Sequence, residues 1–271
     1  MGARSNVKRD RFIEAAVASA KALDREVLDP GVLFGRASND DLEHYSPAML
    51  AEVAAHAQAE IAAWNGSDPR VSVTTIEAAT ATDTTVTVLS VTDRNMPFLY
   101  DSVMGEVTST HRDIHLAIHP ILVVEEGKAP VLFSPEIDSD PARRASHIEI
   151  HLSELSATEA ANLSDRILHV LTQVHLAVAD WQPMLATLEG AVGEMERYGP
   201  ARRKGDKDEA LAFVAWLRDS NFTFLGMREY TYSGKGRERR AGARHRHRAR
   251  HPLRSRRARS APGQGRGHDD A

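Results

Sequence analysis

Cysteine is absent from the chain, so there is no disulfide framework, no thiolate metal site and no cysteine nucleophile. Long apolar runs are absent as well, because none approaches the roughly 20 residues that a membrane-spanning helix needs. Charges interrupt the amino-terminal segment, which lacks the apolar core of a signal peptide. We therefore expect a cytoplasmic protein without a membrane partner.

Several catalytic and nucleotide-binding motifs are also missing. The sequence has neither a Gly-x-Gly-x-x-Gly fingerprint nor a phosphate loop that ends in Gly-Lys-Ser/Thr. It also lacks the Gly-x-Ser-x-Gly turn that exposes a nucleophilic serine. We assign no catalytic residue and expect no cofactor in this chain.

Residues 234–271 lack almost every large apolar side chain. This segment holds one Leu and no Val, Ile, Met, Phe, Tyr or Trp, so it cannot bury enough surface to offset its ordering entropy. It has 12 Arg and one Lys against three acids, whereas residues 1–233 have 21 basic and 35 acidic residues. The composition predicts a disordered, arginine-rich tail behind an acidic body.

The tail has three interpretations. It could be a plain disordered terminus, or an arm that neutralises the phosphates of nucleic acid. Basic arms usually mix Lys with Arg and include aromatic residues, and neither holds here. The third interpretation is translation out of frame, since a GC-rich gene read in the wrong frame gives this mixture of residues. We favour the third, in which the chain is a truncated part of a larger protein and nucleic acid is no partner.

Helical spacing of apolar residues predicts two helices near the amino terminus. The first covers 7–27 and is stopped by the turn residues Asp29-Pro30-Gly31. Ser46 caps the second helix and Pro47 takes its first position. The second helix continues to Trp64.

From residue 71 the apolar period changes to two, which indicates strands. The predicted strands cover 71–76, 84–92, 114–125, 131–133 and 146–152. A helix begins at Phe98, and a capping box of Ser156 and Glu159 opens a long helix that bends or ends near Trp181 and Pro183. A short helix over 209–218 and a strand over 221–232 follow.

This order of elements fits an α+β sandwich, with a mainly antiparallel sheet and helices on one face. We divide the chain into an N-terminal helical segment, the α+β domain, a linker with the start of a second such module, and the tail. These parts cover residues 1–68, 69–200, 201–233 and 234–271.

Two histidine pairs lie in predicted strands. His115 and His119 share one face of their strand, and His147, Glu149 and His151 share one face of theirs. If the strands are neighbours, four imidazoles and a carboxylate could meet on one surface and hold a metal. An antiparallel sheet with one solvated face alternates in the same way without any ligand, and we prefer this second interpretation.

A polar turn leads from the strand over 84–92 into the helix that starts at Phe98. Free backbone N–H groups and the dipole at a helix N-terminus favour a carboxylate or phosphate. The candidate effector-binding residues are Asp93, Arg94, Asn95, Met96, Pro97 and Phe98. The alternative, which we prefer for any specific ligand, is that Asn95 only caps the helix while Met96 and Phe98 belong to the core.

Five segments, in this order, resemble the N-terminal region of the large NAD-specific glutamate dehydrogenases of bacteria. They are SVTDRNMPFLYDSVMGEV (90–107), HPILVV (119–124), SHIEIHLSEL (146–155), VADWQPML (178–185) and FVAWLRDSNFTFLGMREY (213–230). The resemblance implies ACT-like modules in this region. In the parent enzymes a distant domain oxidises L-glutamate with NAD and water to 2-oxoglutarate, ammonium and NADH.

The family's catalytic lysine and dinucleotide glycines belong to sequence that this chain does not contain, so the resemblance carries over no catalytic residue. NAD is implied only for the intact parent enzyme. ACT-like modules bind amino acids, or pair with one another, at the turn between a strand and its first helix, which maps to 93–98. The resemblance also implies a homo-oligomeric, allosterically regulated parent.

We therefore expect a regulatory and assembly fragment of an NAD-dependent glutamate dehydrogenase that is not itself catalytic. The alternative from another class is a free-standing, amino-acid-binding ACT-type sensor with a basic tail that binds nucleic acid.

Overall fold

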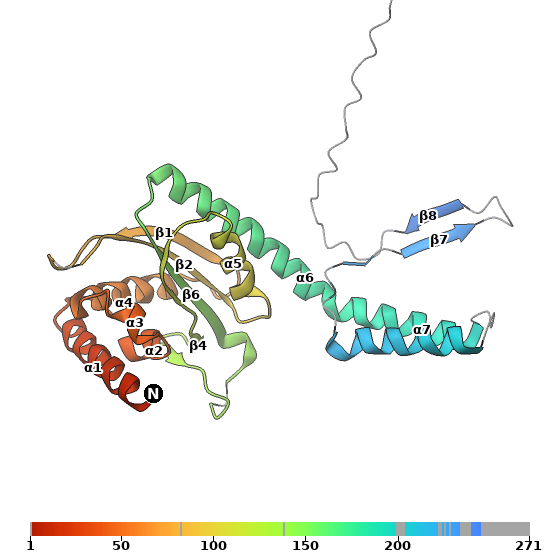
Figure 1. Cartoon of the computed structure of the whole chain (residues 1–271), viewed down its shortest axis with the longest axis horizontal. Coiled ribbons are helices and arrows are strands. Elements are labelled where there is room, and N and C mark those ends of the chain that lie inside the picture. The colour runs from red at the N-terminus through yellow and green to blue at the C-terminus, as the bar shows by residue number, and fades with distance from the viewer. Residues whose placement is uncertain are drawn as a thin grey trace, which may run out of the picture.

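A six-stranded antiparallel sheet with helices on both faces forms the body of the protein (Figure 1). The computed structural model describes residues 2–81, 83–137, 139–198, 204–221, 224, 226–227, 229–233 and 240–244. Every strand pair within the sheet is antiparallel, so the predicted α+β class with a mainly antiparallel sheet is confirmed.

Helices open the chain. They are α1 (Gly2–Ala20), α2 (Pro30–Phe34), α3 (Asn39–Leu42) and α4 (Pro47–Ala62). The prediction of one helix over 7–27 is wrong at its end, because α1 stops at Ala20. The chain then turns back so that Leu28 N can donate to Ala54 O of α4 at 3.2 Å.

Side-chain caps decide where the following helices begin. Asp29, predicted to stop a helix, instead begins α2, because its carboxylate accepts a hydrogen bond from Gly31 N at 2.7 Å. The predicted start of α4 is confirmed: Ser46 Oγ accepts from Met49 N at 3.1 Å, and Pro47 is the first helical residue.

The sheet has the order β1-β2-β6-β4-β5, with β3 also paired to β6. The strands are β1 (Arg70–Ile76), β2 (Val86–Arg94), β3 (Ile114–Ile118), β4 (Ile121–Val123), β5 (Val131–Leu132) and β6 (Arg144–Leu152). β6 therefore lies at the centre, with β2 on one side and β3 and β4 on the other.

One predicted strand, over 114–125, is broken into β3 and β4 at Pro120. Proline has no backbone N–H to donate, so the ladder is interrupted there. The carbonyl of Pro120 still accepts from His147 N at 3.1 Å, which keeps both halves beside β6. The predicted hairpin partner at 131–133 is confirmed as β5.

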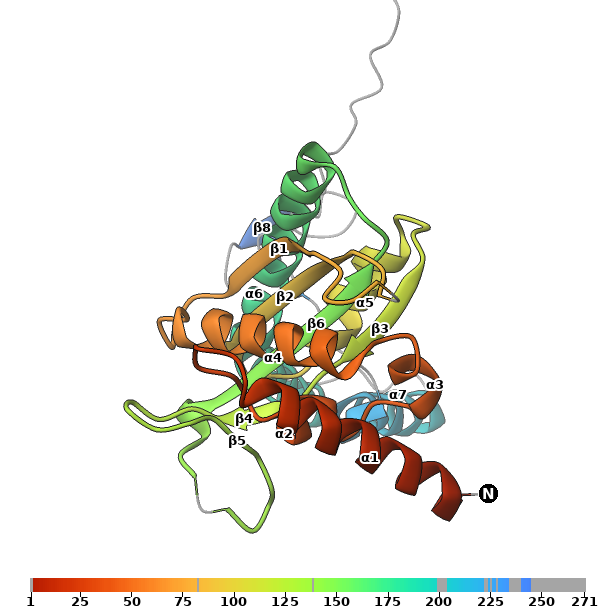
Figure 2. The same cartoon turned by 90° about the vertical axis from the view of Figure 1, so that its left-hand side faces the viewer.

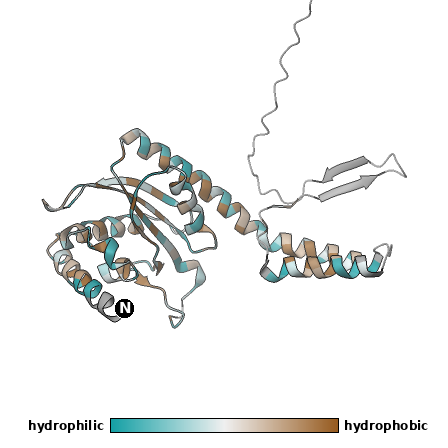
Figure 3. Cartoon of the chain, in the orientation of Figure 1, coloured by the Kyte–Doolittle hydropathy of each residue, from teal (hydrophilic) through white to brown (hydrophobic). Residues whose placement is uncertain are grey.

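Helices α5 (Leu99–Thr108) and α6 (Ala157–Tyr198) cover one face of the sheet. The predicted capping box of α6 is confirmed, because Ser156 N donates to Glu159 Oε2 and Glu159 N donates to Ser156 Oγ. The bend or end predicted near Trp181 does not terminate α6, which continues through Pro183. Hydrophobic and hydrophilic residues alternate along this helix (Figure 3).

The second face of the sheet is covered by the N-terminal helices, with α4 lying across the strands (Figure 2). The sequence placed these helices before the sandwich, not upon it. Two apolar cores result, one on each side of the sheet. The N-terminal helices are thus part of the layered body, and any group between α4 and the sheet is withdrawn from water.

Beyond the sheet, α7 (Lys204–Trp216) runs back beside the far end of α6 (Figure 1). Lys207 Nζ donates to Glu196 O at 2.8 Å where the two helices meet. A 3-10 turn, η1 (Pro141–Arg143), precedes β6, and a π-helical turn, η2 (Leu217–Asn221), ends α7. The strand predicted over 221–232 is described only as β7 (Glu229–Ser233).

Part of the segment predicted as a disordered tail is described as a strand. The backbone of β8 (Arg240–Arg244) pairs antiparallel with that of β7. The prediction of disorder therefore does not hold for those residues. The other residues of 234–271 lie outside the described residues. In the part of the chain that the structure describes, no helix has the length and apolar character needed to cross a membrane.

Candidate functional site

Polar side chains line three neighbouring strands on the side of the sheet that faces α4. Thr92 of β2 lies opposite His147 of β6, and Ser90 lies opposite Glu149. Ser72 of β1 lies opposite Ser90 on the other side of β2. Because residues opposite each other in an antiparallel pair share a face, the register gathers these groups beneath α4.

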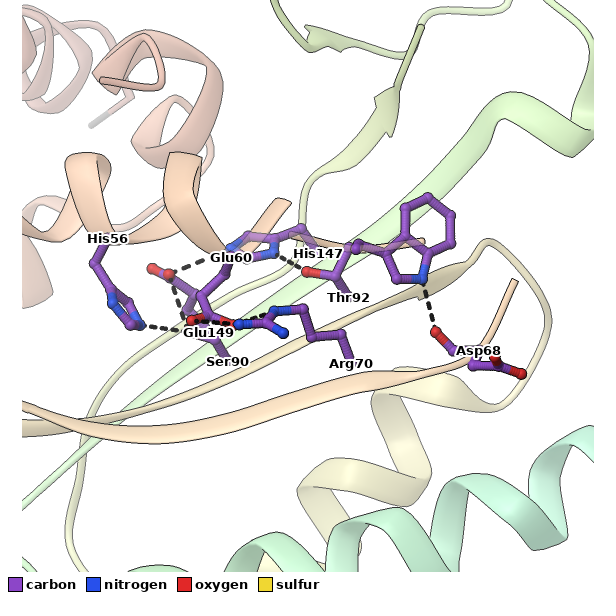
Figure 4. Close-up of polar contacts among 9 residues, drawn as sticks. His56, Glu60, Asp68, Arg70, Ser90, Thr92, His147 and Glu149 are labelled. Atoms are coloured by element: carbon purple, nitrogen blue, oxygen red, sulfur yellow. Dashed lines mark hydrogen bonds and ion pairs between the residues drawn. The ribbon is translucent and has the colours of Figure 1, made fainter. Parts of the chain in front are cut away.

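Glu149 stands at the centre of these residues, and its side chain is fully buried. Ser90 Oγ donates to Glu149 Oε1 at 3.3 Å, and His147 Nε2 lies 3.2 Å from the same oxygen. His56 of α4 points toward Ser90, with its Nε2 atom 3.3 Å from Ser90 Oγ (Figure 4). Since the hydroxyl proton of Ser90 goes to the carboxylate, His56 is the donor to Ser90. Hydrogen bonds therefore connect α4 to a carboxylate in the middle of the sheet.

A second imidazole, His151, approaches Glu149 from the other end of β6. Its Nδ1 atom lies 2.9 Å from the hydroxyl of Tyr45, which precedes α4. With Tyr45 as donor, the ring proton is on Nε2, 3.8 Å from Glu149 Oε2. This distance permits an ion pair but is too long for a hydrogen bond. Glu149 Oε2, His151 Nε2 and Ser72 Oγ have no hydrogen-bond partner among the described residues.

We refer to these residues as the buried polar cluster. Its members are Tyr45, His56, Ser72, Ser90, Thr92, His147, Glu149 and His151. Thr92 Oγ1 lies 2.8 Å from His147 Nδ1, which fixes the orientation of that ring. Six of the eight members are buried, namely Tyr45 and the five on β2 and β6.

Burial and neighbouring charges act against each other in this cluster. Burial alone would raise the pKa of Glu149, but the hydrogen bond with His147 and the nearby imidazole of His151 outweigh it and hold the pKa below its ordinary value. Burial also lowers the pKa of His56, against the opposing effect of Glu149. Burial raises the pKa of Tyr45 and keeps its hydroxyl protonated. The cluster therefore contains an ionised carboxylate beside a neutral His56.

An ion pair closes the cluster at the edge of the sheet. Arg70 of β1 donates to Glu60 of α4 through Nε at 2.7 Å and through Nη2 at 3.3 Å (Figure 4). Beyond it, Trp64 Nε1 donates to the carbonyl of Asp68 at 2.8 Å. Because the Glu60–Arg70 pair is neutral as a unit, the charge of Glu149 must be balanced within the cluster itself.

The structure does not bring the four predicted histidines onto one surface. Leu116, not a histidine, lies opposite His151 in the β3–β6 register, which is irregular between Ile114 and Leu116. His119 stacks on Tyr100 of α5, with ring centroids 5.2 Å apart. His115 Nε2 lies 3.0 Å from the hydroxyl of Ser153.

Because the four histidines do not share a surface, the candidate metal ligands do not meet. Among the described residues, no group of three or more His, Asp or Glu side chains has the geometry to hold a metal ion. The preferred alternative, a solvated face, is also wrong for β6, because α4 covers His147, Glu149 and His151 completely. Sequence reasoning did not include His56 in the site. The usable signal was that Glu52, His56 and Glu60, at intervals of four residues, are polar groups on one side of an alanine-rich helix.

The predicted effector turn lies on the opposite face, at the end of β2. Asp93 is buried there, accepts from Arg94 N at 2.8 Å through Oδ1, and lies 2.5 Å from His175 Nε2 through Oδ2. Asn95 does not cap α5, contrary to one interpretation. Its N donates to Arg144 O at 2.7 Å and its Oδ1 accepts from Ser146, because the turn continues the pairing with β6.

Phe98 occupies the position before α5, and no side chain caps the helix there. Its φ of 70° is left-handed, a region that non-glycine residues rarely adopt. Met96 packs against the core under α5 and α6, as predicted, but the ring of Phe98 is 42% exposed and so is not a core residue. Arg94 and Pro97 are exposed. The first turn of α5 is thus open at a partly exposed surface.

The strand-to-helix turns of the sheet do not fit a dinucleotide. Close approach of a pyrophosphate requires glycine in such a turn, at the start of the helix. The β2–α5 connection, residues 95–98, and the β6–α6 connection, residues 153–156, contain no glycine. No step of a hydride transfer can be assigned to these turns.

The mainly antiparallel sheet with helices on both faces defines an α+β type of domain. Residues 31–167 match the family described as "Glutamate dehydrogenase, ACT1 domain", and the chain belongs to this family. The match includes α2, α3 and α4 as well as the sheet, so the layer that covers the buried polar cluster is within the matched region.

Two curated relatives are NAD-specific glutamate dehydrogenases. The protein of Halomonas elongata is 36% identical over 151 residues, which is 54% of this chain and 9% of the relative. The protein of Pseudomonas aeruginosa is 30% identical over 159 residues, with the same shares of the two chains. The chain therefore matches a small part of each relative's length.

Proposed function

We propose that this chain serves as a regulatory and assembly module of an NAD-dependent glutamate dehydrogenase. The observation that carries the proposal is the match of residues 31–167 to the ACT1 domain of that enzyme. The described strand-to-helix turns, which lack glycine, agree with a role other than binding the dinucleotide. In this proposal NAD and the oxidation of glutamate belong to other parts of the enzyme.

The proposal includes an amino-acid effector at residues 93–98. The uncapped first turn of α5 offers backbone N–H groups and the positive end of a helix dipole to a carboxylate. Arg94 is exposed beside it and can add a charged donor. Asp101, in the first turn of α5, is available for the amino group of the same ligand. These groups suit a zwitterionic amino acid.

The same turn is connected to α6, which leads away from the sheet. Asp93 lies 2.5 Å from His175 of α6, and Met96 packs in the core that α5 and α6 share. An effector that fits one position of α6 better than another would change the balance between the two positions by that difference in affinity. Through this change in the position of α6, an amino acid bound at residues 93–98 would influence subunit packing.

Calorimetry and thermal unfolding with a panel of L-amino acids on the full chain test the effector. Heat of binding and a raised midpoint with at least one amino acid are expected. The Arg94→Ala variant should lose the response, whereas Arg36→Ala, an exposed arginine elsewhere, should keep it. Absence of heat and of any midpoint shift across the panel contradicts the effector site.

Two further measurements test the wider role. Light scattering of the purified chain should show a concentration-dependent oligomer, and a monomer at every concentration contradicts the assembly role. Incubation with L-glutamate and NAD should give no NADH absorbance. Turnover would assign the chemistry to residues that we treat as regulatory.

A further inference from the structure

His56 is the point at which solvent and the buried polar cluster meet. It lies on α4 and lines a groove of about 530 Å³ together with Glu52, Thr75 and Ile76. On the side of His56 that faces the sheet, its Nε2 atom is hydrogen-bonded to Ser90 Oγ, which in turn is hydrogen-bonded to Glu149. A proton can therefore reach this imidazole from the groove while α4 remains in place.

Burial around His56 favours its neutral form while α4 is docked, against the opposing charges of Glu149 and Glu60. Charged and titratable groups surround His56 on both sides. Toward the sheet they are Glu60 on α4, Tyr45 before α4, Arg70 on β1, and His147, Glu149 and His151 on β6. Toward the groove they are Arg25, Glu26, Glu52 and Glu77, of which Arg25 and Glu52 form an ion pair with each other. Glu60 is already paired with Arg70. A proton on His56 would compete with His147 and His151 for the single carboxylate of Glu149.

We propose that the buried polar cluster makes the attachment of α4 to the sheet sensitive to protons, with His56 as the residue that takes up the proton when α4 opens. The proposal is independent of the amino-acid effector, because His56 and the turn at 93–98 lie on opposite faces of the sheet. Acid shifts the equilibrium toward an open α4, which uncovers the apolar side of the sheet that carries Val88, Leu116 and Ile118.

The direction of the effect follows from the pKa of His56. Burial holds this pKa below its ordinary value of 6.5, so the closed form binds fewer protons than the open form once the pH falls below that value. Stability of the closed form is complete above pH 6.5 and declines as the pH falls toward the lowered pKa. One proton gives at most about a tenfold change of the opening equilibrium per pH unit.

The apolar contacts of α4 limit the size of the response. Met49, Leu50, Val53, Ala54 and Ala57 of this helix are buried in the core on its side of the sheet. These contacts hold α4 down whatever the charge of His56. The proton therefore changes how often α4 opens and does not release the helix outright. The carboxylate of Glu149, whose pKa is also lowered, titrates only in stronger acid, below its ordinary value of 4.5.

Hydrogen exchange of the full chain at pH 7.5 and pH 5.5, corrected for intrinsic rates, tests the proposal. Peptides from α4 should open several-fold more often at the lower pH, up to about tenfold per pH unit, while peptides from α6 should not change. The His56→Gln variant keeps a donor without a titrating ring and should lose the acid response of α4. The matched His169→Gln variant, at an exposed histidine of α6, should keep it.

Equal responses of α4 and α6, or an unchanged acid response in His56→Gln, would overturn the proposal. If His56→Gln does not fold, an NMR titration of the His56 ring in the unmodified chain decides the matter. A midpoint below 6.5 supports the proposal, and a midpoint at or above 6.5 contradicts it.

Discussion

On the side of the sheet that faces α5 and α6, the central strand β6 presents Ile148 and Ile150 to an apolar core. On the side that faces α4, the intervening residues of the same strand present His147, Glu149 and His151. Both faces are buried, yet one is held by apolar contacts and the other contains an ionised carboxylate beneath a helix.

The contrast teaches what each face contributes. An apolar face gains free energy from burial but tolerates more than one arrangement of the helices upon it. A buried carboxylate needs its donors in place, so α4 fits in one position only, with His56 above Ser90. A register slip of one residue would place Glu149 in the apolar core, which makes the strand order specific as well as stable.

The largest expected effect comes from removal of the carboxylate. Glu149→Ala leaves His147 and Ser90 without their shared acceptor, and loss of one partner from a buried charged group costs about 3–5 kcal/mol of unfolding free energy. Urea denaturation at pH 7 measures the loss. Glu154→Ala, an exposed glutamate just past the same strand, should change stability by at most about 0.5 kcal/mol. Equal losses in the two variants would show that the cluster is not a stabilising feature.

The neighbouring residue gives the matching test of the apolar face. Ile150→Ala creates a cavity under α5 and α6 and should cost about 2–5 kcal/mol. Because Ile150 belongs to the apolar core, the loss should be the same at pH 7.5 and pH 5.5 in urea denaturation. A loss that grows in acid would mean that the two faces are not independent.

Much of this architecture could be predicted from the sequence, because it depends on local signals. Ser46-Pro47 marked the start of α4, and the Ser156–Glu159 box marked the start of α6, since caps act within one turn. Period-two alternation placed His147, Glu149 and His151 on a common face. Such signals specify elements and their faces, residue by residue.

The rest could not be predicted, because it depends on contacts between distant segments. Alternation does not tell which face water reaches, and here the return of α4 over the sheet removed water from Glu149. Likewise, pairing to the start of β6 took Asn95 out of the capping position. The register that put Leu116 opposite His151, and so turned His119 away from the histidines of β6, is set only when β3 meets β6.

An intermediate effect is expected at the contact between buried Asp93 and His175 on the side that faces α5 and α6. His175→Ala leaves the buried Asp93 carboxylate without its partner on α6, which should cost about 1–3 kcal/mol. His169→Ala, an exposed histidine of the same helix, should have little effect on urea denaturation. If both variants lose the same amount of unfolding free energy, the Asp93–His175 contact does not attach α6 to the end of β2.

The smallest effect concerns the two helices that cover the two faces, each of which begins at a capping serine. Ser156→Ala removes the cap of α6 and should cost about 1 kcal/mol in urea denaturation. Thr158→Ala, exposed within the first turn, removes no cap and should be neutral.

Ser46→Ala should cost more than Ser156→Ala, because the Ser46 hydroxyl caps α4 and also donates to Asp83 Oδ2 at 2.7 Å. The reverse order would show that the attachment of α4 does not depend on its capped N-terminus, and would leave the buried polar cluster as the feature that positions this helix.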